Sequence, residues 1–339
     1  MRRFVWALIA AAFLGASAAH AQTAPEAGFG AYLRPQQLVA VGPGRSINLV
    51  CMGQGAPTVI LSDGGASWSL QWFKVQPMVA RKTRVCAWDR AGNGFSGASS
   101  EPQDVAHTEA DLEAALKGAG VTGPLVLVGH SVGGFESLLF ADRNRDRVAG
   151  MVLVDPSYPD QVVRLARAAP ALMQYSNDAD RKGLEHYRRC IDALKAGGRD
   201  PPPGECVSLR AGLPEPMRAA MLGLTTDPAY WQTFLSLFEL KDRNARLAVN
   251  PRRDYSDMPL IVMGSGVVKL PGAPEAIVRE IPALDAELQS GLEALAHLSS
   301  RGSYVRVPES GHAIQLQKPA AVIQAIETVV EQARRPPGR

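Results

Sequence analysis

Short apolar runs alternate with longer stretches of helical spacing along most of the chain. The runs are too short for helices and are bounded by turn residues, so they predict strands. They cover residues 37–41, 46–51, 58–61, 84–88, 125–128, 150–154, 259–263 and 304–307. The first two are joined by Gly42-Pro43-Gly44 and predict an antiparallel edge, whereas the later alternation favours parallel strands. The pattern predicts an α/β fold with a mostly parallel eight-stranded sheet flanked by helices.

Helical spacing appears between the predicted strands. Thr108 and Asp111 resemble a capping box at a helix start, and Leu112 and Leu116 share one face of that helix. Further helical stretches cover residues 70–80 and 274–299, and Pro319 fits the first turn of a last helix.

No strand pattern occurs between residues 155 and 259. A structureless loop of this length is improbable in a compact domain, and the segment contains stripes with helical spacing. One stripe contains Met217, Met221 and Leu224, and another Tyr230, Trp231, Phe234 and Phe238. We therefore expect a helical lid insertion at residues 158–257, within a core formed by residues 22–157 and 258–333.

The two ends of the chain have their own compositions. Arg2 and Arg3 precede an apolar run over residues 4–14, and Ala19-His20-Ala21 is an A-x-A cleavage site, so residues 1–21 predict a secretory signal peptide. The run is too short to span a bilayer, so we expect a periplasmic or secreted protein without a stable membrane anchor after cleavage. Residues 334–339 predict a disordered, solvated tail.

Composition is ordinary for a soluble globular protein, with 46% hydrophobic and 20% charged residues. Loss of two arginines with the leader lowers the formal net charge of +3 to +1. This balance argues against a nucleic-acid partner, and it leaves the oligomeric state unknown.

An exported protein can keep disulfides, and this chain has four cysteines. Cys190 and Cys206 flank a Gly/Pro-rich turn, which favours a local bridge. Cys51 and Cys86 lie in two predicted strands and would pair if those strands were neighbours. The alternative for each pair is two free buried thiols.

The sequence Gly129-His130-Ser131-Val132-Gly133-Gly134 lies between a predicted strand and a predicted helix. G-x-S-x-G in this setting is typical of a nucleophile elbow, in which a serine sits on a sharp, strained turn. The alternative is a glycine-rich turn with an incidental serine.

A serine nucleophile needs a nearby base and an acid that orients the base. His312 follows a C-terminal strand in a Ser-Gly-His loop and is the expected base; the backbone turn should aim His130 away from the Ser131 hydroxyl. Asp155, at the end of the preceding strand, is the preferred acid. Glu275, Asp285 and Asp160 are alternatives, because the usual position after residues 259–263 has no aspartate.

An oxyanion hole needs two backbone N–H donors. We expect Val132, which follows the serine, and Gly65, with Gly64 as second choice; the alternative is a tight turn without a ligand.

These residues resemble the α/β-hydrolase superfamily, specifically secreted or periplasmic bacterial members with a helical lid. The resemblance covers nearly all of the mature chain and is most specific at Gly129–Gly133, the loop from Asp89 to Ser96, Val154-Asp155-Pro156 and Ser310-Gly311-His312. It implies a structural role for Asp89. The chain departs from the family in two places. It has Asp63-Gly64 where a His-Gly pair is common, and it has no acid directly after the seventh strand. Some members carry the acid after the sixth strand, in agreement with Asp155.

The expected function is a serine hydrolase that cleaves a carboxylic ester or related small-molecule acyl substrate through an acyl-enzyme, with no cofactor and no metal. Tyr230, Trp231 and Phe234 are expected to line the substrate pocket, or else to form the core of the insertion. Alternatives are a peptidase, amidase or perhydrolase on the same triad, and a non-catalytic protein of this fold that binds a ligand.

Overall fold

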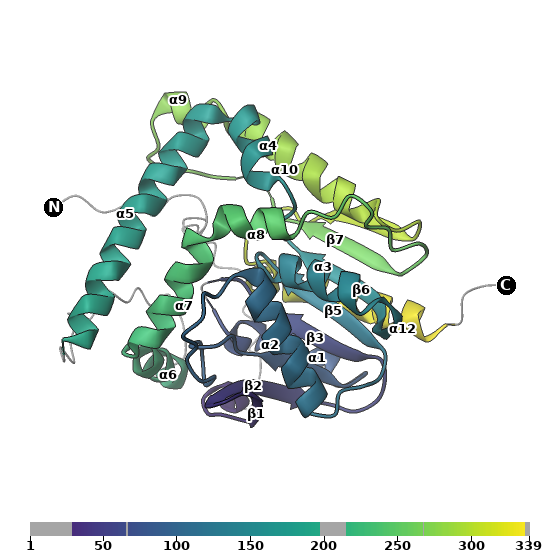
Figure 1. The fold of residues 1–339 in the computed structure, drawn as a ribbon. Helices are drawn as coiled ribbons and strands as arrows, with labels where there is room; N and C mark the ends of the chain where they lie inside the picture. The colour runs from purple at the N-terminus through teal and green to yellow at the C-terminus, as the bar shows by residue number, and fades with distance from the viewer. Residues whose placement is uncertain (1–28, 66, 197–214, 267, 336–339) are drawn as a thin grey trace.

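The computed structural model describes residues 29–65, 67–196, 215–266 and 268–335 (Figure 1). Its strands are β1 (Gln37–Gly42), β2 (Arg45–Met52), β3 (Thr58–Ser62), β4 (Val85–Trp88), β5 (Leu125–His130), β6 (Val148–Val154), β7 (Leu260–Gly264) and β8 (Gly302–Arg306). Its α-helices are α1 (Gln76–Val79), α2 (Val105–Gly118), α3 (Gly133–Arg143), α4 (Gln161–Ala168), α5 (Pro170–Lys195), α6 (Glu215–Thr225), α7 (Pro228–Glu239), α8 (Lys241–Leu247), α9 (Glu275–Val278), α10 (Ile281–Ala296), α11 (Ile314–Gln317) and α12 (Pro319–Arg334).

In the part of the chain that the structure describes, eight strands form one sheet in the order β1-β2-β4-β3-β5-β6-β7-β8. β2 pairs antiparallel with both β1 and β4, and all later pairs are parallel. The expected fold class is confirmed, including the antiparallel edge. Parallel pairing places the carboxyl ends of β3, β5, β6, β7 and β8 at one edge of the sheet.

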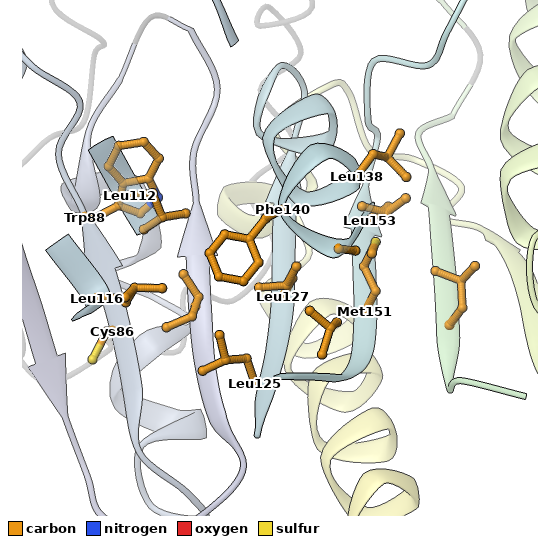
Figure 2. Close-up of a cluster of buried hydrophobic side chains, with 14 of the residues drawn as sticks. Cys86, Trp88, Leu112, Leu116, Leu125, Leu127, Leu138, Phe140, Met151 and Leu153 are labelled. Carbon is orange, nitrogen blue, oxygen red and sulfur yellow. The ribbon is translucent and has the colours of Figure 1, made fainter. Parts of the chain in front are cut away.

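Hydrophobic side chains cover both faces of the sheet, as its apolar strands require. One cluster joins the sheet to α2, α3 and α10, and the other joins it to α1 and α12. Figure 2 shows Leu112 and Leu116 of α2 beside Trp88 and Cys86 of β4, and Phe140 of α3 beside Leu127 of β5. The packing of these clusters fixes the positions of β5 and α3. The turn between β5 and α3 carries the candidate nucleophile.

Three predicted helical stretches differ in the structure, one of which, residues 274–299, is divided into α9 and α10. α2 begins at Val105, because the side chain of Asp104 caps the helix by accepting from the backbone N–H groups of Ala106 and His107. Thr108 therefore lies inside the helix, where its hydroxyl donates to Glu136 at 2.6 Å. The expected helix over residues 70–80 is divided into a short 3₁₀ helix (Ser69–Trp72) and α1. Pro319 begins α12 as predicted.

Cys51 and Cys86 form a disulfide between β2 and β4, where they are directly opposite each other in the antiparallel register. Closing a loop of 35 residues stabilises a fold by up to about 4 kcal/mol in the chain-entropy model. Cys190 is also disulfide-bonded, and Cys206, its expected partner, lies outside the described residues.

Helices α4 to α8 follow one another between β6 and β7, and α5, α6 and α7 stand together beside the sheet in Figure 1. This segment corresponds to the predicted insertion, and its role as a lid stays a prediction. None of the described helices is long and apolar enough to cross a membrane. The expected signal peptide lies outside the described residues. Arg334, expected in the tail, instead ends α12, because its guanidinium donates to the carbonyl of Ala56.

Candidate active site

Ser131 occupies the turn between β5 and α3, with a positive φ of 54° that non-glycine residues rarely adopt. Its backbone carbonyl accepts hydrogen bonds from the N–H groups of Gly134 and Ser157, both at 2.9 Å. These bonds hold the strained turn, as expected for a nucleophile elbow.

The glycines around Ser131 are required by close backbone approach. A Cβ on Gly129 would lie 2.3 Å from the carbonyl oxygen of Gly133, and a Cβ on Gly133 would lie 2.6 Å from that of Ser62. Either contact would force the backbone to shift. Glycine at both positions therefore allows α3 to start directly behind the strand and the oxyanion loop, which we define as residues 63–65.

Asp155 lies beside Ser131 because the register of β5 and β6 pairs His130 with Val154, the residues immediately before them. Its side chain makes two hydrogen bonds, accepting from the backbone N–H of Ser265 at 2.9 Å and pairing with Nδ1 of His312 at 2.7 Å. The structure thus brings the expected base and preferred acid into direct contact.

Two opposing effects act on the Asp155 carboxyl. Burial would raise its pKa, but the hydrogen bond with His312, the charge of that imidazole and the Ser265 N–H together hold the pKa below its usual value. The carboxylate is therefore ionised at neutral pH, which fixes Nδ1 of a neutral His312 as the protonated nitrogen and leaves Nε2 to accept a proton.

The alternative acids interact elsewhere. Asp285 pairs with Arg306 at 2.8 Å, and Glu275 forms an ion pair with Arg279 on the neighbouring turn of α9. Asp160 precedes α4 with a left-handed backbone conformation. These positions favour Asp155 as the partner of His312.

His130 lies against His312, and the prediction that its side chain points away from the Ser131 hydroxyl stays a prediction. Its ring contacts the ring of His312, with 4.7 Å between centroids and planes tilted by 44°. Its Nε2 lies 2.9 Å from the backbone carbonyl oxygen of His312. The sequence signal for this contact was weak, because a position directly before the nucleophile does not reveal which distant loop folds over it.

The two expected oxyanion donors are neighbours. Val132 directly precedes α3, and a Cβ on Gly65 would lie 3.7 Å from the Val132 Cγ1. A Cβ on Gly64 would lie 3.5 Å from the Ser131 Cβ. The oxyanion loop therefore runs alongside the elbow, where backbone N–H groups can stabilise a negative charge that develops on a substrate.

Arg90 connects the oxyanion loop to α3 and was not singled out by the sequence interpretation. Its fully buried guanidinium donates to the Asp63 side chain at 2.7 Å, to the carbonyls of Asp63 and Gly64 at 2.7 and 3.1 Å, and to both carboxylate oxygens of Glu136 at 2.7 Å. Burial raises the pKa of Asp63 well above its usual value against the opposing charge of Arg90. The sequence feature that could have indicated this cluster was Asp63, which stands where the family commonly has a histidine.

Asp89, next to Arg90, is fully buried and accepts hydrogen bonds from Asn48, Ser69 and Phe95. These contacts shape the loop after β4, in agreement with the structural role that the family resemblance implies.

Tyr230 and Trp231 are buried in a cluster with Tyr32, Trp68 and Met217. The indole of Trp231 donates to the carbonyl of Thr225 at 2.7 Å. This packing favours their alternative role as core residues of the insertion, and the placement of the Phe234 side chain lies outside what the structure describes.

Residues near the carboxyl end of α7 approach the oxyanion loop instead. A Cβ on Gly65 would lie 3.5 Å from Phe238 and 3.9 Å from Leu237. Within the described ranges, no group of three or more His, Cys, Asp or Glu side chains is arranged to hold a metal ion.

Comparison with known proteins finds partial similarity to several curated relatives. An uncharacterized protein of Schizosaccharomyces pombe is 44% identical over 81 residues, which are 24% of this chain and 15% of that protein. An AB hydrolase superfamily protein of Gibberella zeae is 22% identical over 294 residues, which are 82% of this chain and 87% of that protein. The chain spans less than half of the length of the first curated relatives that it matches.

Solved structures share the fold over most of the chain. An esterase from Thermogutta terrifontis has a TM-score of 0.58 and 20% identity, covering 88% of this chain and 100% of the esterase. A haloalkane dehalogenase variant from Bradyrhizobium elkanii has a TM-score of 0.62 and 18% identity, covering 88% and 96%. These likenesses concern the fold and not the reaction.

The family model described as "alpha/beta hydrolase fold" matches residues 57–251, more than half of the chain. This segment includes the elbow, Asp155 and most of the insertion. The protein therefore belongs to the α/β-hydrolase fold family.

Proposed function

We propose that the protein is a serine hydrolase that cleaves a carboxylic ester through an acyl-enzyme formed on Ser131. The observation that carries the proposal is the 2.7 Å contact between His312 and Asp155, at the sheet edge where Ser131 occupies a strained strand-to-helix turn. This arrangement supports the proposal of a base and its orienting acid at the sheet edge that carries the proposed nucleophile.

In the proposed mechanism, the Ser131 Oγ attacks the ester carbonyl carbon while Nε2 of His312 removes the hydroxyl proton. Asp155 stabilises the imidazolium that forms, and the N–H groups of Val132 and Gly65 stabilise the oxyanion. His312 then donates the proton to the leaving alkoxide. A water molecule, deprotonated by His312, then attacks the acyl-enzyme. The bond between the acyl carbon and the Ser131 Oγ breaks, His312 returns the proton to that Oγ, and the carboxylic acid leaves.

We propose an uncharged, moderately apolar small-molecule acyl substrate. Leu237 and Phe238 support this proposal, because apolar side chains of α7 approach Gly65 in the oxyanion loop. The segment α4–α8 would then act as a lid and determine which substrates bind. A panel of p-nitrophenyl esters tests it: short or medium acyl chains should react fastest, and exclusive hydrolysis of a charged ester would contradict it.

We also propose that the protein acts in the periplasm or outside the cell, after removal of residues 1–21. The disulfide between β2 and β4 supports an oxidising compartment. N-terminal sequencing of the exported protein should begin at Gln22, and recovery of the uncleaved chain from the cytoplasm would contradict this location.

Replacement of Ser131 tests the nucleophile. Ser131→Ala should abolish both hydrolysis of short p-nitrophenyl esters and covalent labelling by a fluorophosphonate, without loss of the folded circular dichroism signal. Ser157→Ala is a suitable control, because Ser157 contacts the elbow through its backbone N–H and keeps this donor. Retained turnover in Ser131→Ala would refute the assignment.

Replacement of Asp155 tests the acid. Asp155→Asn should lower kcat by about 10³- to 10⁴-fold, because an amide favours the wrong imidazole tautomer and cannot stabilise an imidazolium. A loss of only a few-fold would assign the acid role to another carboxylate.

A further inference from the structure

His130 is the last residue of β5, and its side chain is buried, with 3% of the residue exposed. It reaches two loops that are far apart in the sequence. One is the oxyanion loop, where a Cβ on Gly64 would lie 2.9 Å from the His130 Nδ1. The other is the loop of His312, 182 residues away along the chain.

The contact with the second loop has a defined donor and acceptor. A carbonyl oxygen only accepts hydrogen bonds, so the His130 Nε2, 2.9 Å from the carbonyl oxygen of His312, must carry the hydrogen. The ring of His130 also lies against the ring of His312, 4.7 Å between centroids.

Asp155 holds His312 at a single atom, Nδ1 of the imidazole. One hydrogen bond at the end of a side chain leaves the imidazole able to pivot as its backbone moves. The bond from His130 acts on the backbone carbonyl of the same residue, and His130 directly precedes Ser131 in the chain. The elbow that carries the nucleophile therefore also fixes the backbone that carries the base.

We propose that His130 is a positioning residue, which holds the His312 backbone at the elbow through the hydrogen bond from its Nε2. This inference rests on the proposed function, in which His312 is the base for Ser131. His130 acts only through His312 and the loop that carries it, and it neither transfers a proton nor touches the substrate.

Because proton transfer depends steeply on geometry, loss of this bond affects the chemical step. Displacement of a catalytic group by about 1 Å lowers turnover by about 100-fold. Loss of the bond should therefore lower kcat by about 10- to 100-fold. KM should change less than about 2-fold, since the proposal gives the buried imidazole no contact with the substrate.

Three variants separate the hydrogen bond from the ring contact. His130→Gln places an amide N–H close to the position of Nε2 and removes the ring, His130→Phe keeps a ring without the donor, and His130→Ala removes both. Circular dichroism and thermal melting select the folded variants. Two measurements are compared with wild type: the kcat and KM for a p-nitrophenyl ester, and the rate of fluorophosphonate labelling.

The expected result is a kcat within about 3-fold of wild type for His130→Gln, and a loss of about 10- to 100-fold with unchanged KM for His130→Phe and His130→Ala. The rates of fluorophosphonate labelling should decrease in the same variants as the kcat values. The proposal is overturned if His130→Phe keeps the wild-type kcat, if His130→Gln is as slow as His130→Phe, or if KM rather than kcat changes. Failure of the wild type to be labelled would overturn the proposed function and this inference together, whereas equal labelling of wild type and all variants would overturn only the role of His130.

Discussion

Arg90→Met should lower the free energy of unfolding by about 3–5 kcal/mol at pH 7, because it removes the cation from a fully buried ion cluster. The guanidinium contacts both oxygens of Glu136 and one of Asp63, all at 2.7 Å. Methionine is shorter and uncharged but has a similar volume, so the substitution keeps most of the volume while it removes the five hydrogen bonds.

The magnitude follows from the charges in the cluster. Burial raises the pKa of Asp63 well above its usual value, and the Arg90 guanidinium donates to both carboxylate oxygens of Glu136 but to only one of Asp63. Arg90→Met would leave the Glu136 carboxylate buried with no cation. Loss of one partner from a buried pair costs about 3–5 kcal/mol. The hydroxyl of Thr108, which donates to Glu136 at 2.6 Å, should keep the loss near the lower end of this range.

Equilibrium unfolding in urea, followed by far-ultraviolet circular dichroism at pH 7, measures this loss. Arg306→Met is a matched control, because Arg306 forms its ion pair with Asp285 at the partly exposed surface, and such pairs contribute at most about 1 kcal/mol. The double variant Arg90→Met/Glu136→Gln should recover at least about 1 kcal/mol relative to Arg90→Met, because it removes the uncompensated charge.

Two results would refute this reasoning about the cluster. One is a loss for Arg90→Met no larger than that for Arg306→Met. The other is a double variant no more stable than the single one, which would mean that the buried charge of Glu136 is not the source of the penalty.

Two further predictions concern other buried positions. Burial raises the pKa of Glu109 from 4.5 to about 7. Between these pH values the folded protein keeps a proton on Glu109 that the unfolded chain loses. The free energy of unfolding therefore falls as the pH rises from about 4.5 to 7. Relative to Glu109→Gln, the wild type should therefore lose about 1–2 kcal/mol between pH 4.5 and 8 in urea unfolding, after allowance for the ion pair with the partly exposed Arg143. Parallel pH profiles would contradict this. Gly291→Ala should destabilise by about 1–3 kcal/mol, because its Cβ would lie 2.3 Å from the buried ring of Tyr158. Gly223→Ala in α6, with open space around the Cβ position, should be neutral or stabilising by thermal melting, and equal melting temperatures for the two variants would refute the packing argument.

Local patterns in the sequence predicted most of the fold. Short apolar runs and helical spacing depend on nearby residues, so the strands and the start of α12 at Pro319 followed from the chain itself. The glycines around Ser131 likewise predicted a strained turn between a strand and a helix. Even so, the predicted start of α2 was wrong: Asp104, a local N-cap directly before the helix, was missed, and the contact of Thr108 with Glu136 depends on tertiary packing.

Which residues meet in the candidate site depends on contacts between distant parts of the chain. Chain order suggested His312 and favoured Asp155 among several acids, but the 2.7 Å contact between them joins residues 157 positions apart. The pairing of Cys51 with Cys86 likewise became definite only when β2 and β4 were neighbours.

Neighbouring residues encode the succession of strands and helices along the chain, the elbow at Ser131 and a short set of candidates for its partners. The folded chain was needed to show which acid contacts His312, that His130 binds the backbone of His312, and that Arg90 joins the oxyanion loop to α3. These contacts form only when the sheet brings the ends of several strands to one edge, and no local pattern specifies which side chains meet there.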